Sequence, residues 1–364
     1  MSEKKIKIIY IKPNDSSFIR VDQNILEKHY EVIPVLLFQQ KGKLQYGLKN
    51  ILMFFRLLRN GLRGNTAFIC WFADYHAAVM VLAAKITGTK SVIFIGGQEA
   101  VCYPELRKGV YRKKIRGALV GYALKNASLI IANHKSLIYH ENYYYNPGNP
   151  HIDGIKHYVK NIETPIEIIY NGINTEKFVR NYSIKKEENL ILTVGNMNQM
   201  GDFYNKGFDL FMQVAERNPQ WQFILISLKN NCVDFVEENY HFSKIPNLKV
   251  YQSFCTQEML NDIYNRAHIF VQASITEGMP NTLGEAMLLE CIPVGSNVNG
   301  IPDAIGDTGV VITKRTPEDL EQGIQEAMKM NTGPQAHERV IQMFSLKRRD
   351  KEIKSVLDNL FSED

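Results

Sequence analysis

The sequence predicts an α/β protein of two Rossmann-like domains that face each other across a cleft. The chain has 364 residues, which is too long for one ordinary core and suits two domains of common size. Short apolar runs rich in β-branched residues alternate with helical stretches, a pattern typical of parallel sheets with crossover helices. This pattern occurs twice, and the polar, charged stretch 175–188 between the two occurrences is expected to be the interdomain linker.

In the first half, the strands are expected where apolar residues run together and the helices where apolar residues recur at helical spacing. The expected strands are 6–11, 31–38, 67–71, 91–95, 129–132 and 166–170, and the expected helices are 19–28, 48–62, 77–86 and 110–124. Residues 142–150 (NYYYNPGNP) are rich in turn-forming residues and predict an irregular loop. The helix at 48–62 is expected to face the core of its domain.

The second half repeats the pattern, and its first expected strand ends at Gly195. The expected strands are 190–194, 223–227, 248–251, 269–273 and 293–295, and the expected helices are 208–216, 257–267, 281–290, 317–330 and 347–360. We therefore place one domain at 1–174 and the other at 188–346.

The composition is that of an ordinary soluble globular protein, with 45% hydrophobic and 22% charged residues. No apolar run approaches the roughly 18–20 residues of a membrane-spanning helix, and the charged start runs directly into a strand without an evident secretory signal. The five cysteines are odd in number and form no CxxC pair, which argues against a disulfide framework or a zinc site. We expect a cytoplasmic protein with reduced thiols.

The charge is unevenly distributed along the chain. Residues 1–180 hold 26 Lys and Arg against 13 Asp and Glu, a formal charge of +13, and the remainder carries −8. The asymmetry predicts an anionic partner for the first half, either an anionic membrane or a phosphate-linked acceptor. Nucleic acid is not expected, because no motif supports it. The protein would then make peripheral contact with the inner face of the membrane.

Six basic residues without an acid among them form a cluster in the first half. They are Arg107, Lys108, Arg112, Lys113, Lys114 and Arg116. On a helix they would present a positive face to anionic lipid or to a lipid-diphosphate acceptor. An ordinary solvated helix face explains the cluster equally well.

The segment 274–309 (SITEGMPNTLGEAMLLECIPVGSNVNGIPDAIGDTG) carries the clearest chemistry. A strand ends near Ser274, and a loop leads directly into a helix. In open α/β sheets, ligands lie at the carboxyl ends of the strands, so the free N–H groups at the start of this helix would suit a phosphate or diphosphate. These groups belong to Asn281, Thr282 and Leu283. Gly278 lets the ligand approach the backbone closely.

Two carboxylates flank this expected anion site. Glu277 precedes the helix and Glu285 lies within it. Carboxylates only accept hydrogen bonds, so they suit hydroxyl groups: Glu277 those of a sugar and Glu285 those of a ribose. Two surface glutamates on a helix are the alternative, and their spacing alone would not decide between the two.

The pattern EGxPxxxxEAM at 277–287, followed by Pro293-Val294 and Gly300-Ile301-Pro302, resembles the signature of retaining glycosyltransferase family 4, the group 1 glycosyltransferases of the GT-B fold. This resemblance implies an acceptor-binding domain at 1–174 and a nucleotide-sugar-binding domain at 188–346. It also implies that a C-terminal helix, about 347–364, packs back on the first domain. No metal or other cofactor is expected beside the nucleotide-sugar donor.

Val194-Gly195 followed by Lys206-Gly207-Phe208 also resembles the family, whose lysine contacts the donor diphosphate. Such a lysine would stabilise the charge that builds on the leaving group. The family commonly has an arginine after the first glycine, where this chain has Asn196, so one cationic contact would be lost. The resemblance implies a donor site formed by Gly195, Asn196, Gly278, Met279, Pro280, Asn281, Thr282, Leu283 and Glu285, with Lys206 and Glu277 as catalytic residues.

The acceptor side departs further from the family. Residues 12–18 lack the glycine-rich loop that often follows the first strand, and residues 95–99 (IGGQE) stand where many members have a histidine. Gly97 would still permit close approach, and Gln98 is expected beside the acceptor. Glu99 could bind the acceptor or act as a base, although a surface glutamate explains it equally well.

We expect a retaining, hexosyltransferase-like enzyme that moves a sugar from a nucleotide sugar to a glycan or lipid-linked acceptor, in cell-surface polysaccharide or glycoconjugate synthesis. Because no covalent nucleophile is evident, a same-face displacement assisted by the diphosphate is expected. The donor base would contact backbone groups near 253–256. Two alternatives remain: a GT-B sugar-nucleotide epimerase or phosphorylase, and a catalytically weak donor-binding assembly partner, which Asn196 and the missing histidine would favour.

Overall fold

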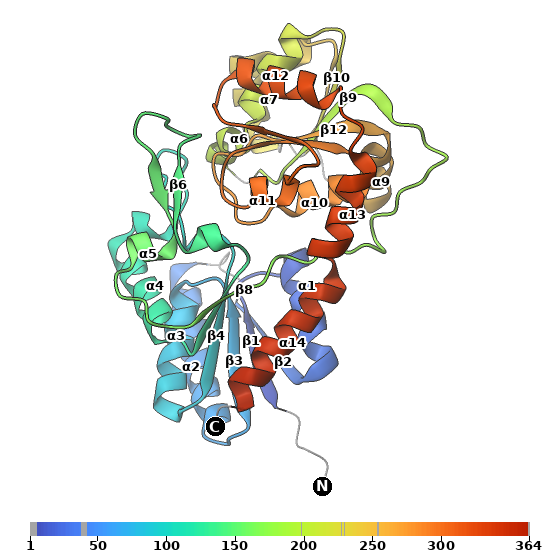
Figure 1. Cartoon of the computed structure of the whole chain (residues 1–364). Helices are drawn as coiled ribbons and strands as arrows, with labels where there is room; N and C mark the ends of the chain where they lie inside the picture. The colour runs from blue at the N-terminus through green and yellow to red at the C-terminus, as the bar shows by residue number, and fades with distance from the viewer. Residues whose placement is uncertain are drawn as a thin grey trace.

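The computed structural model describes residues 6–37, 42–197, 199–226, 228, 230–252 and 255–362. It contains two six-stranded parallel sheets with strand orders β2-β1-β3-β4-β5-β8 and β11-β10-β9-β12-β13-β14. Both orders are those of doubly wound α/β domains. The predicted architecture of two Rossmann-like domains, one above the other in Figure 1, is confirmed.

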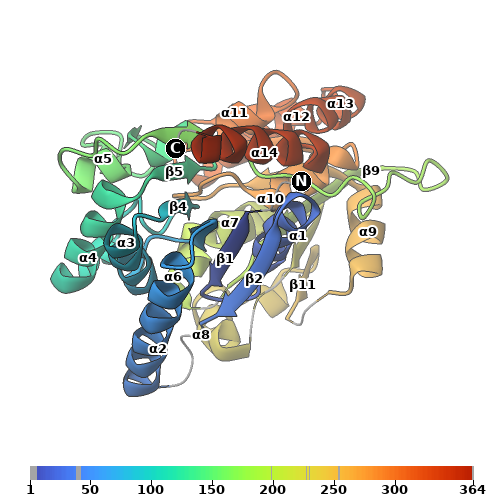
Figure 2. The same cartoon turned by 90° about the horizontal axis from the view of Figure 1, so that it is seen from below.

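The first sheet has α2, α3 and α4 on one face and α1 on the other (Figures 1 and 2). The elements of this part are β1 (Lys7–Lys12), α1 (Ser17–His29), β2 (Glu31–Leu36), α2 (Lys43–Gly61), β3 (Thr66–Trp71), α3 (Tyr75–Thr87), β4 (Lys90–Ile95), η1 (Val110–Arg112), α4 (Lys114–Asn126), β5 (Leu129–Ala132), η2 (Lys135–Leu137), β6 (His140–Asn142), β7 (His151–Asp153), α5 (Ile155–Tyr158) and β8 (Ile166–Ile168). The sequence pattern anticipated most of these positions, because each buried strand is a continuous apolar run.

The second sheet is surrounded by shorter helices. Its elements are β9 (Glu187–Val194), α6 (Met200–Asn205), α7 (Phe208–Arg217), β10 (Gln222–Ile226), α8 (Asn230–Tyr240), η3 (Phe242–Lys244), β11 (Leu248–Tyr251), α9 (Gln257–Arg266), β12 (Ala267–Gln272), α10 (Asn281–Leu288), β13 (Ile292–Ser296), α11 (Ile301–Ile305), β14 (Val310–Ile312), α12 (Pro317–Ala327) and α13 (Gly333–Phe344). The last helix, α14 (Leu346–Ser362), follows α13 but packs on the first domain. The sequence pattern missed α6, α8, α11, β14 and α13.

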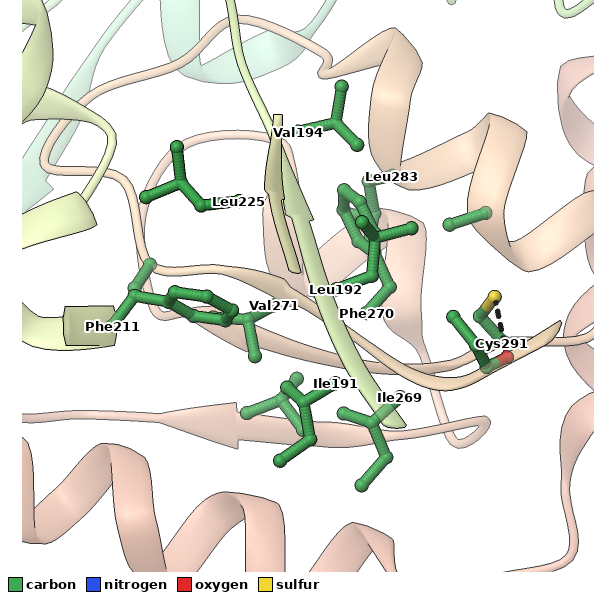
Figure 3. Close-up of a cluster of buried hydrophobic side chains, with 14 of the residues drawn as sticks. Ile191, Leu192, Val194, Phe211, Leu225, Ile269, Phe270, Val271, Leu283 and Cys291 are labelled. Carbon is green, nitrogen blue, oxygen red and sulfur yellow. Dashed lines mark hydrogen bonds between the residues drawn. The ribbon is translucent and has the colours of Figure 1, made fainter. Parts of the chain in front are cut away.

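The core of the second domain fixes the strand ends that carry the site. Leu192 of β9 pairs in register with Phe270 of β12, and both side chains are fully buried (Figure 3). Burying such a side chain contributes about 1.5–3 kcal/mol. Leu283 of α10 lies in the same cluster. This contact seats the start of α10 at the carboxyl end of β12.

The C-terminal helix α14 returns to the first domain and runs along it (Figure 1). Ile353 and Leu357 are fully buried in that domain's core. Arg349 donates to both carboxylate oxygens of Asp22 on α1, each at 2.7 Å, and to the carbonyl oxygens of Ile169 and Tyr170. A bidentate pair with these further hydrogen bonds satisfies a guanidinium that is almost completely buried.

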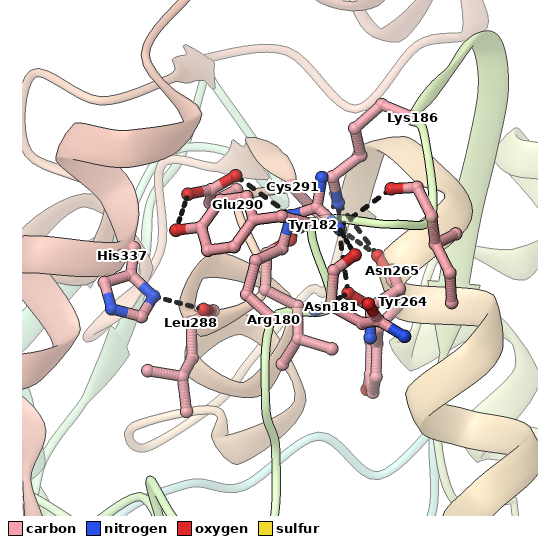
Figure 4. Close-up of polar contacts among 12 residues, drawn as sticks. Arg180, Asn181, Tyr182, Lys186, Tyr264, Asn265, Leu288, Glu290, Cys291 and His337 are labelled. Carbon is pink, nitrogen blue, oxygen red and sulfur yellow. Dashed lines mark hydrogen bonds and ion pairs between the residues drawn. The ribbon is translucent and has the colours of Figure 1, made fainter.

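The linker before β9 is held against the second domain by polar contacts (Figure 4). Arg180 contacts Glu290 at 3.0 Å and Asn265 at 3.1 Å. Lys186 donates to three carbonyl oxygens, those of Tyr264, Ala267 and Leu289. Burial lowers the pKa of this lysine. The charged residues that mark the stretch as a linker in the sequence therefore also anchor it.

The hairpin β6–β7 reaches from the first domain to the second (Figure 1). The side chain of Asn142 donates to the carbonyl oxygen of Ile275 at 2.7 Å, and Tyr144 in the turn is buried in the core cluster of the second domain. The irregular loop expected at 142–150 is therefore the turn of an antiparallel hairpin. Its strands are three residues each, too short to produce a recognisable alternation.

Two expectations about the surface of the first domain are corrected. Met53 and Leu57 of α2 face the core, but Leu48, Ile51 and Phe55 are between 56% and 62% exposed, so the helix does not simply face inward.

In the described part of the chain, no helix is long and apolar enough to cross a membrane.

The expected basic helix face over residues 107–116 is also wrong in part. Lys108 precedes α4 and pairs with Asp202 of the second domain at 3.1 Å. Arg116 pairs with Asp74 through two hydrogen bonds, and that carboxylate also caps α3. Lys108 and Arg116 are therefore held in tertiary contacts and do not belong to a solvated helix face. The sequence alone could not reveal these contacts.

Candidate active site

A cavity of about 370 Å³ lies between the two domains and is lined by residues of both. It brings together most of the predicted site residues. Those lining it are Gly97, Gln98, Gly195, Asn196, Lys206, Glu277, Gly278, Met279, Pro280, Asn281 and Thr282. Glu99, Leu283 and Glu285 are not among its lining residues.

The start of α10 is open toward this cavity. Pro280 occupies the N-cap position, and among the described residues no side chain caps the helix and its first turn carries no acid. The side chain of Asn171 donates to the carbonyl oxygen of Met279 and to Oδ1 of Asn281, each at 3.0 Å. These contacts fix the loop while N–H groups at the helix start stay available for an anion.

Lys206 and Glu277 form an ion pair at the wall of the cavity. Both side chains are less than one-fifth exposed. Two further contacts fix the position of Glu277. Its backbone N–H donates to Oδ1 of Asn299 at 2.9 Å, and the Ser274 hydroxyl donates to its Oε1 at 3.4 Å. A partly buried cation and carboxylate thus stand side by side next to the open helix start.

The turn that presents Lys206 depends on glycine. Gly207 has φ +71, which favours glycine, and a Cβ there would lie 2.3 Å from the carbonyl oxygen of Ala273. At Gly195, a Cβ would lie 2.9 Å from the ring of Phe208. Close packing of the strand ends therefore explains both glycines of the motif.

Lys108 is a candidate that the sequence reasoning did not select for the site. It comes from the first domain, lines the same cavity and pairs with Asp202 at 3.1 Å. Burial and the nearby charge of Lys206 lower the pKa of Lys108. Its membership of the basic cluster was the available signal, but only the fold brings it beside Lys206.

Glu99 lies behind the cavity wall and is fully buried. Its Oε1 accepts a hydrogen bond from the N–H of Gly96 at 2.9 Å, and burial raises its pKa to about 7. It lines a second cavity of about 130 Å³ together with His76 and Arg116. Since Gln98 lines both cavities, Glu99 is adjacent to the cleft without facing it.

Leu283 and Glu285 point elsewhere on α10. The Leu283 side chain belongs to the core, so only its backbone could serve a ligand. Glu285 is largely buried and accepts a hydrogen bond from the Tyr264 hydroxyl at 3.3 Å. Burial raises the pKa of Glu285 to about 7. The expected ribose contact by Glu285 remains a prediction.

An aromatic wall on the first-domain side was not predicted. Phe18, Trp71 and Phe72 line the cavity, and their rings meet edge to face. Phe72 has φ +66, an uncommon conformation for a bulky residue. A Cβ at Gly96 would lie 3.1 Å from Trp71 and 3.2 Å from Phe72, so the glycine makes room for the wall. The strained backbone directs attention to Phe72 as a functional residue.

The two domains touch closely at the cavity. A Cβ at Gly278 would lie 2.6 Å from the carbonyl oxygen of Gly96 in the opposite domain. Beside this contact, Asp303 accepts hydrogen bonds from His134 at 3.0 Å and Lys135 at 2.7 Å. The structure therefore shows the domains in contact around the predicted donor site.

Residues 188–330 match the family described as "Glycosyl transferases group 1". The phosphatidylinositol N-acetylglucosaminyltransferase gpi3 subunit of Schizosaccharomyces pombe is 22% identical over 208 residues, which are 54% of this chain and 44% of that protein. An uncharacterised glycosyltransferase of Methanocaldococcus jannaschii is 23% identical over 184 residues, 46% of this chain and 45% of that protein. The chain thus aligns with less than half the length of these curated relatives.

Solved structures show the same fold over nearly the whole chain. Sucrose-phosphate synthase from Thermosynechococcus elongatus has a TM-score of 0.74 at 12% identity, covering 98% of this chain and 100% of that one. HepE from Anabaena, in complex with UDP and glucose, has a TM-score of 0.68 at 14% identity, and the alignment covers 97% of this chain and 100% of that one. The chain therefore has the fold of GT-B glycosyltransferases, and the match of residues 188–330 to the group 1 family supports a transferase.

Proposed function

We propose that this protein is a retaining glycosyltransferase that moves a sugar from a nucleotide sugar to a glycan or lipid-linked acceptor. One observation carries the proposal: the Lys206–Glu277 ion pair lies beside the uncapped start of α10 in a cavity between two domains. The helix start suits the donor diphosphate. Lys206 would stabilise the charge that develops on it, and Glu277 would then accept hydrogen bonds from the sugar.

Lys108 offers a cation to the proposed diphosphate site, where Asn196 in place of an arginine leaves one cationic contact missing. The family's arginine would supply a second cation to the diphosphate, and Lys108 is placed at the same cavity by the opposite domain. We assign to it a supporting contact with the diphosphate. With this contact the charge missing at Asn196 would have a substitute, which argues against the assembly-partner alternative.

For the reaction itself, we propose a same-face displacement in which the leaving diphosphate assists deprotonation of the acceptor hydroxyl. Glu277 is paired with Lys206 and held by Asn299, an arrangement that favours positioning of the sugar over attack on it. No step is assigned to a metal, so transfer is expected to persist in the presence of a chelator. A place in cell-surface polysaccharide or glycoconjugate synthesis remains part of this proposal.

The acceptor is proposed to approach along the aromatic wall. The faces of Phe18 and Phe72 offer apolar surface of the kind that stacks against a sugar ring, and Gly97 permits close approach on the same side. The donor base is expected near 253–256, of which residues 253 and 254 lie outside the described part of the chain.

A screen with labelled UDP, GDP and ADP sugars tests the proposal. Transfer or slow hydrolysis with retained anomeric configuration, followed by NMR, is the expected result. Epimerised donor would instead support the epimerase alternative, and donor binding without any turnover would support an assembly partner. Glu277→Ala should cut turnover by about 100-fold or more while the melting temperature stays close to that of the wild type.

A further inference from the structure

Helix α2 presents an apolar stripe to the outside of the protein. We call Leu44, Leu48, Ile51, Leu52 and Phe55 the outer stripe. Their spacing of three and four residues places them on one face of the helix. Leu44 is 91% exposed, and the others are more than half exposed. In Figure 2, α2 extends from the body of the first domain, and its position explains this exposure.

Neighbouring helices extend this apolar surface. Leu82 and Ile86 of α3 and Ile115 of α4 are also exposed, and α3 packs against both α2 and α4. Isolated exposed apolar residues are common on soluble proteins, but exposed apolar residues gathered on three neighbouring helices favour an interaction site. An apolar groove of about 760 Å³ runs between these helices and is lined by Tyr46, Leu82 and Tyr122, among others.

Basic residues lie along the outer stripe. Lys49, Arg56 and Arg59 are exposed on the same helix, and Arg63, also exposed, follows the end of α2. Between Glu31 and Glu99 the sequence contains one acid, Asp74, and its carboxylate is engaged by Arg116. The positive charge beside the stripe is therefore not balanced from within this stretch of the chain.

We propose that this face docks on an anionic lipid bilayer, with the outer stripe among the acyl chains and the arginines at the headgroup phosphates. An apolar face bordered by Arg and Lys is the pattern of helices that lie in a membrane interface, and anionic headgroups would supply the missing counter-charge. The helix has 19 residues, which at about 1.5 Å per residue allows it to lie along the surface.

This assignment differs from one based on the basic residues 107–116. Lys108 and Arg116 of that cluster are held in contacts within the protein, whereas Lys113 and Lys114 are exposed at the start of α4. Lys113 also lines the apolar groove. The docking face is thus centred on α2, and the exposed lysines at the start of α4 form its edge. If the proposed transfer uses a lipid-linked acceptor, docking would hold the enzyme at the surface that carries it.

Vesicle flotation without any nucleotide sugar tests the docking proposal directly. The full chain should float with vesicles of phosphatidylcholine and phosphatidylglycerol at about 0.1 M salt, and much less with phosphatidylcholine alone. Leu48→Glu and Phe55→Glu should each lower the partition coefficient about tenfold or more, because they place a charge at the apolar contact. Arg56→Gln combined with Arg59→Gln should weaken binding to anionic vesicles and reduce its salt dependence.

Matched controls are available in the second domain and its linker. Val179 is 56% exposed, so Val179→Glu adds the same charge to an exposed apolar site elsewhere, and Lys329→Gln removes one exposed cation. Both should float like the wild type. Unchanged circular dichroism and melting temperature would show that the α2 variants are folded.

Two results would overturn the proposal. The first is a wild-type chain that stays unbound, or a folded Leu48→Glu variant that floats as well as the wild type. The second is a lipid-free dimer, measured by light scattering, that Leu48→Glu dissociates, because a second copy would then cover this face. Since no donor is present, neither result bears on the transferase proposal, which the turnover assay decides separately.

Discussion

Replacing Lys206 with alanine removes the cation that faces the proposed leaving group. The lysine is less than one-fifth exposed, so its charge is only partly screened. Two unit charges about 4 Å apart interact by about 4 kcal/mol at an effective dielectric constant of 20. Part of this interaction already exists with the bound donor, because the diphosphate is charged before the bond breaks. The differential loss is expected to be about 2.7–4 kcal/mol, the range for removing one hydrogen-bond donor of an oxyanion hole.

This range corresponds to a fall in kcat of about 100-fold to 1,000-fold, with a smaller change in KM for the donor. Initial rates of nucleotide release, measured with the donor found in the sugar screen, provide the assay. Lys329→Ala, an exposed lysine of the same domain, serves as the matched control. A folded Lys206→Ala variant with kcat within about threefold of the wild type would refute the electrostatic reasoning.

Further predictions concern the residues around the cation site. Lys108→Gln should lower kcat about 10-fold to 100-fold; unchanged rates would exclude it from the site. Gly278→Ala should reduce turnover strongly because its Cβ would lie 2.6 Å from the Gly96 carbonyl oxygen, and normal rates would show that the domains need not approach so closely. Phe72→Ala should raise KM for the acceptor more than for the donor, and equal effects would contradict the aromatic wall. Burial raises the pKa of Glu99 to about 7, so the folded protein binds this proton more tightly than the unfolded chain does, and stability should fall as pH rises from about 5 to 7. Glu99→Gln should therefore flatten the fall of Tm with pH; an unchanged profile would show that another group is responsible.

Much of the fold could be predicted because buried parallel strands have a local signature. β1, β4 and β12 each contain an uninterrupted apolar run of three or four residues, and each was expected within a residue or two. By contrast, α6 and α11 have six and five residues. Elements this short span too few turns to show helical periodicity, so tertiary packing determines them.

The position of the candidate site residues was predictable where one short segment carries them. The pattern at 277–287 contains Glu277, the open helix start and the glycine of the close approach, and all of these lie at the cavity. The direction of individual side chains was not predictable. Leu283 and Glu285 belong to the same segment but turn toward the core and toward Tyr264, because successive helix positions rotate around the axis.

The contribution of the first domain was the least predictable from sequence. Lys108 was one basic residue in a cluster, and Phe72 was the residue after an apolar strand. What distinguishes them is the packing of chain segments far apart in sequence: Lys108 meets Asp202 of the other domain, and Phe72 adopts a positive φ beside Gly96. Neither property leaves a local trace in the residue types.

In the proposed reaction, the arrangement of the two lysines would link domain contact to catalysis. Lys206 belongs to the second domain and Lys108 to the first, and both line one cavity. A diphosphate held by the second domain would gain the charge of Lys108 only while the domains are in contact, as they are at Gly96 and Gly278. Separation of the domains would remove that cation and admit water, which weakens the remaining electrostatic stabilisation. Asn196 stands where the family that the sequence resembles commonly has an arginine. A proposed reaction that uses Lys108 in place of that arginine would depend more strongly on closure of the two domains.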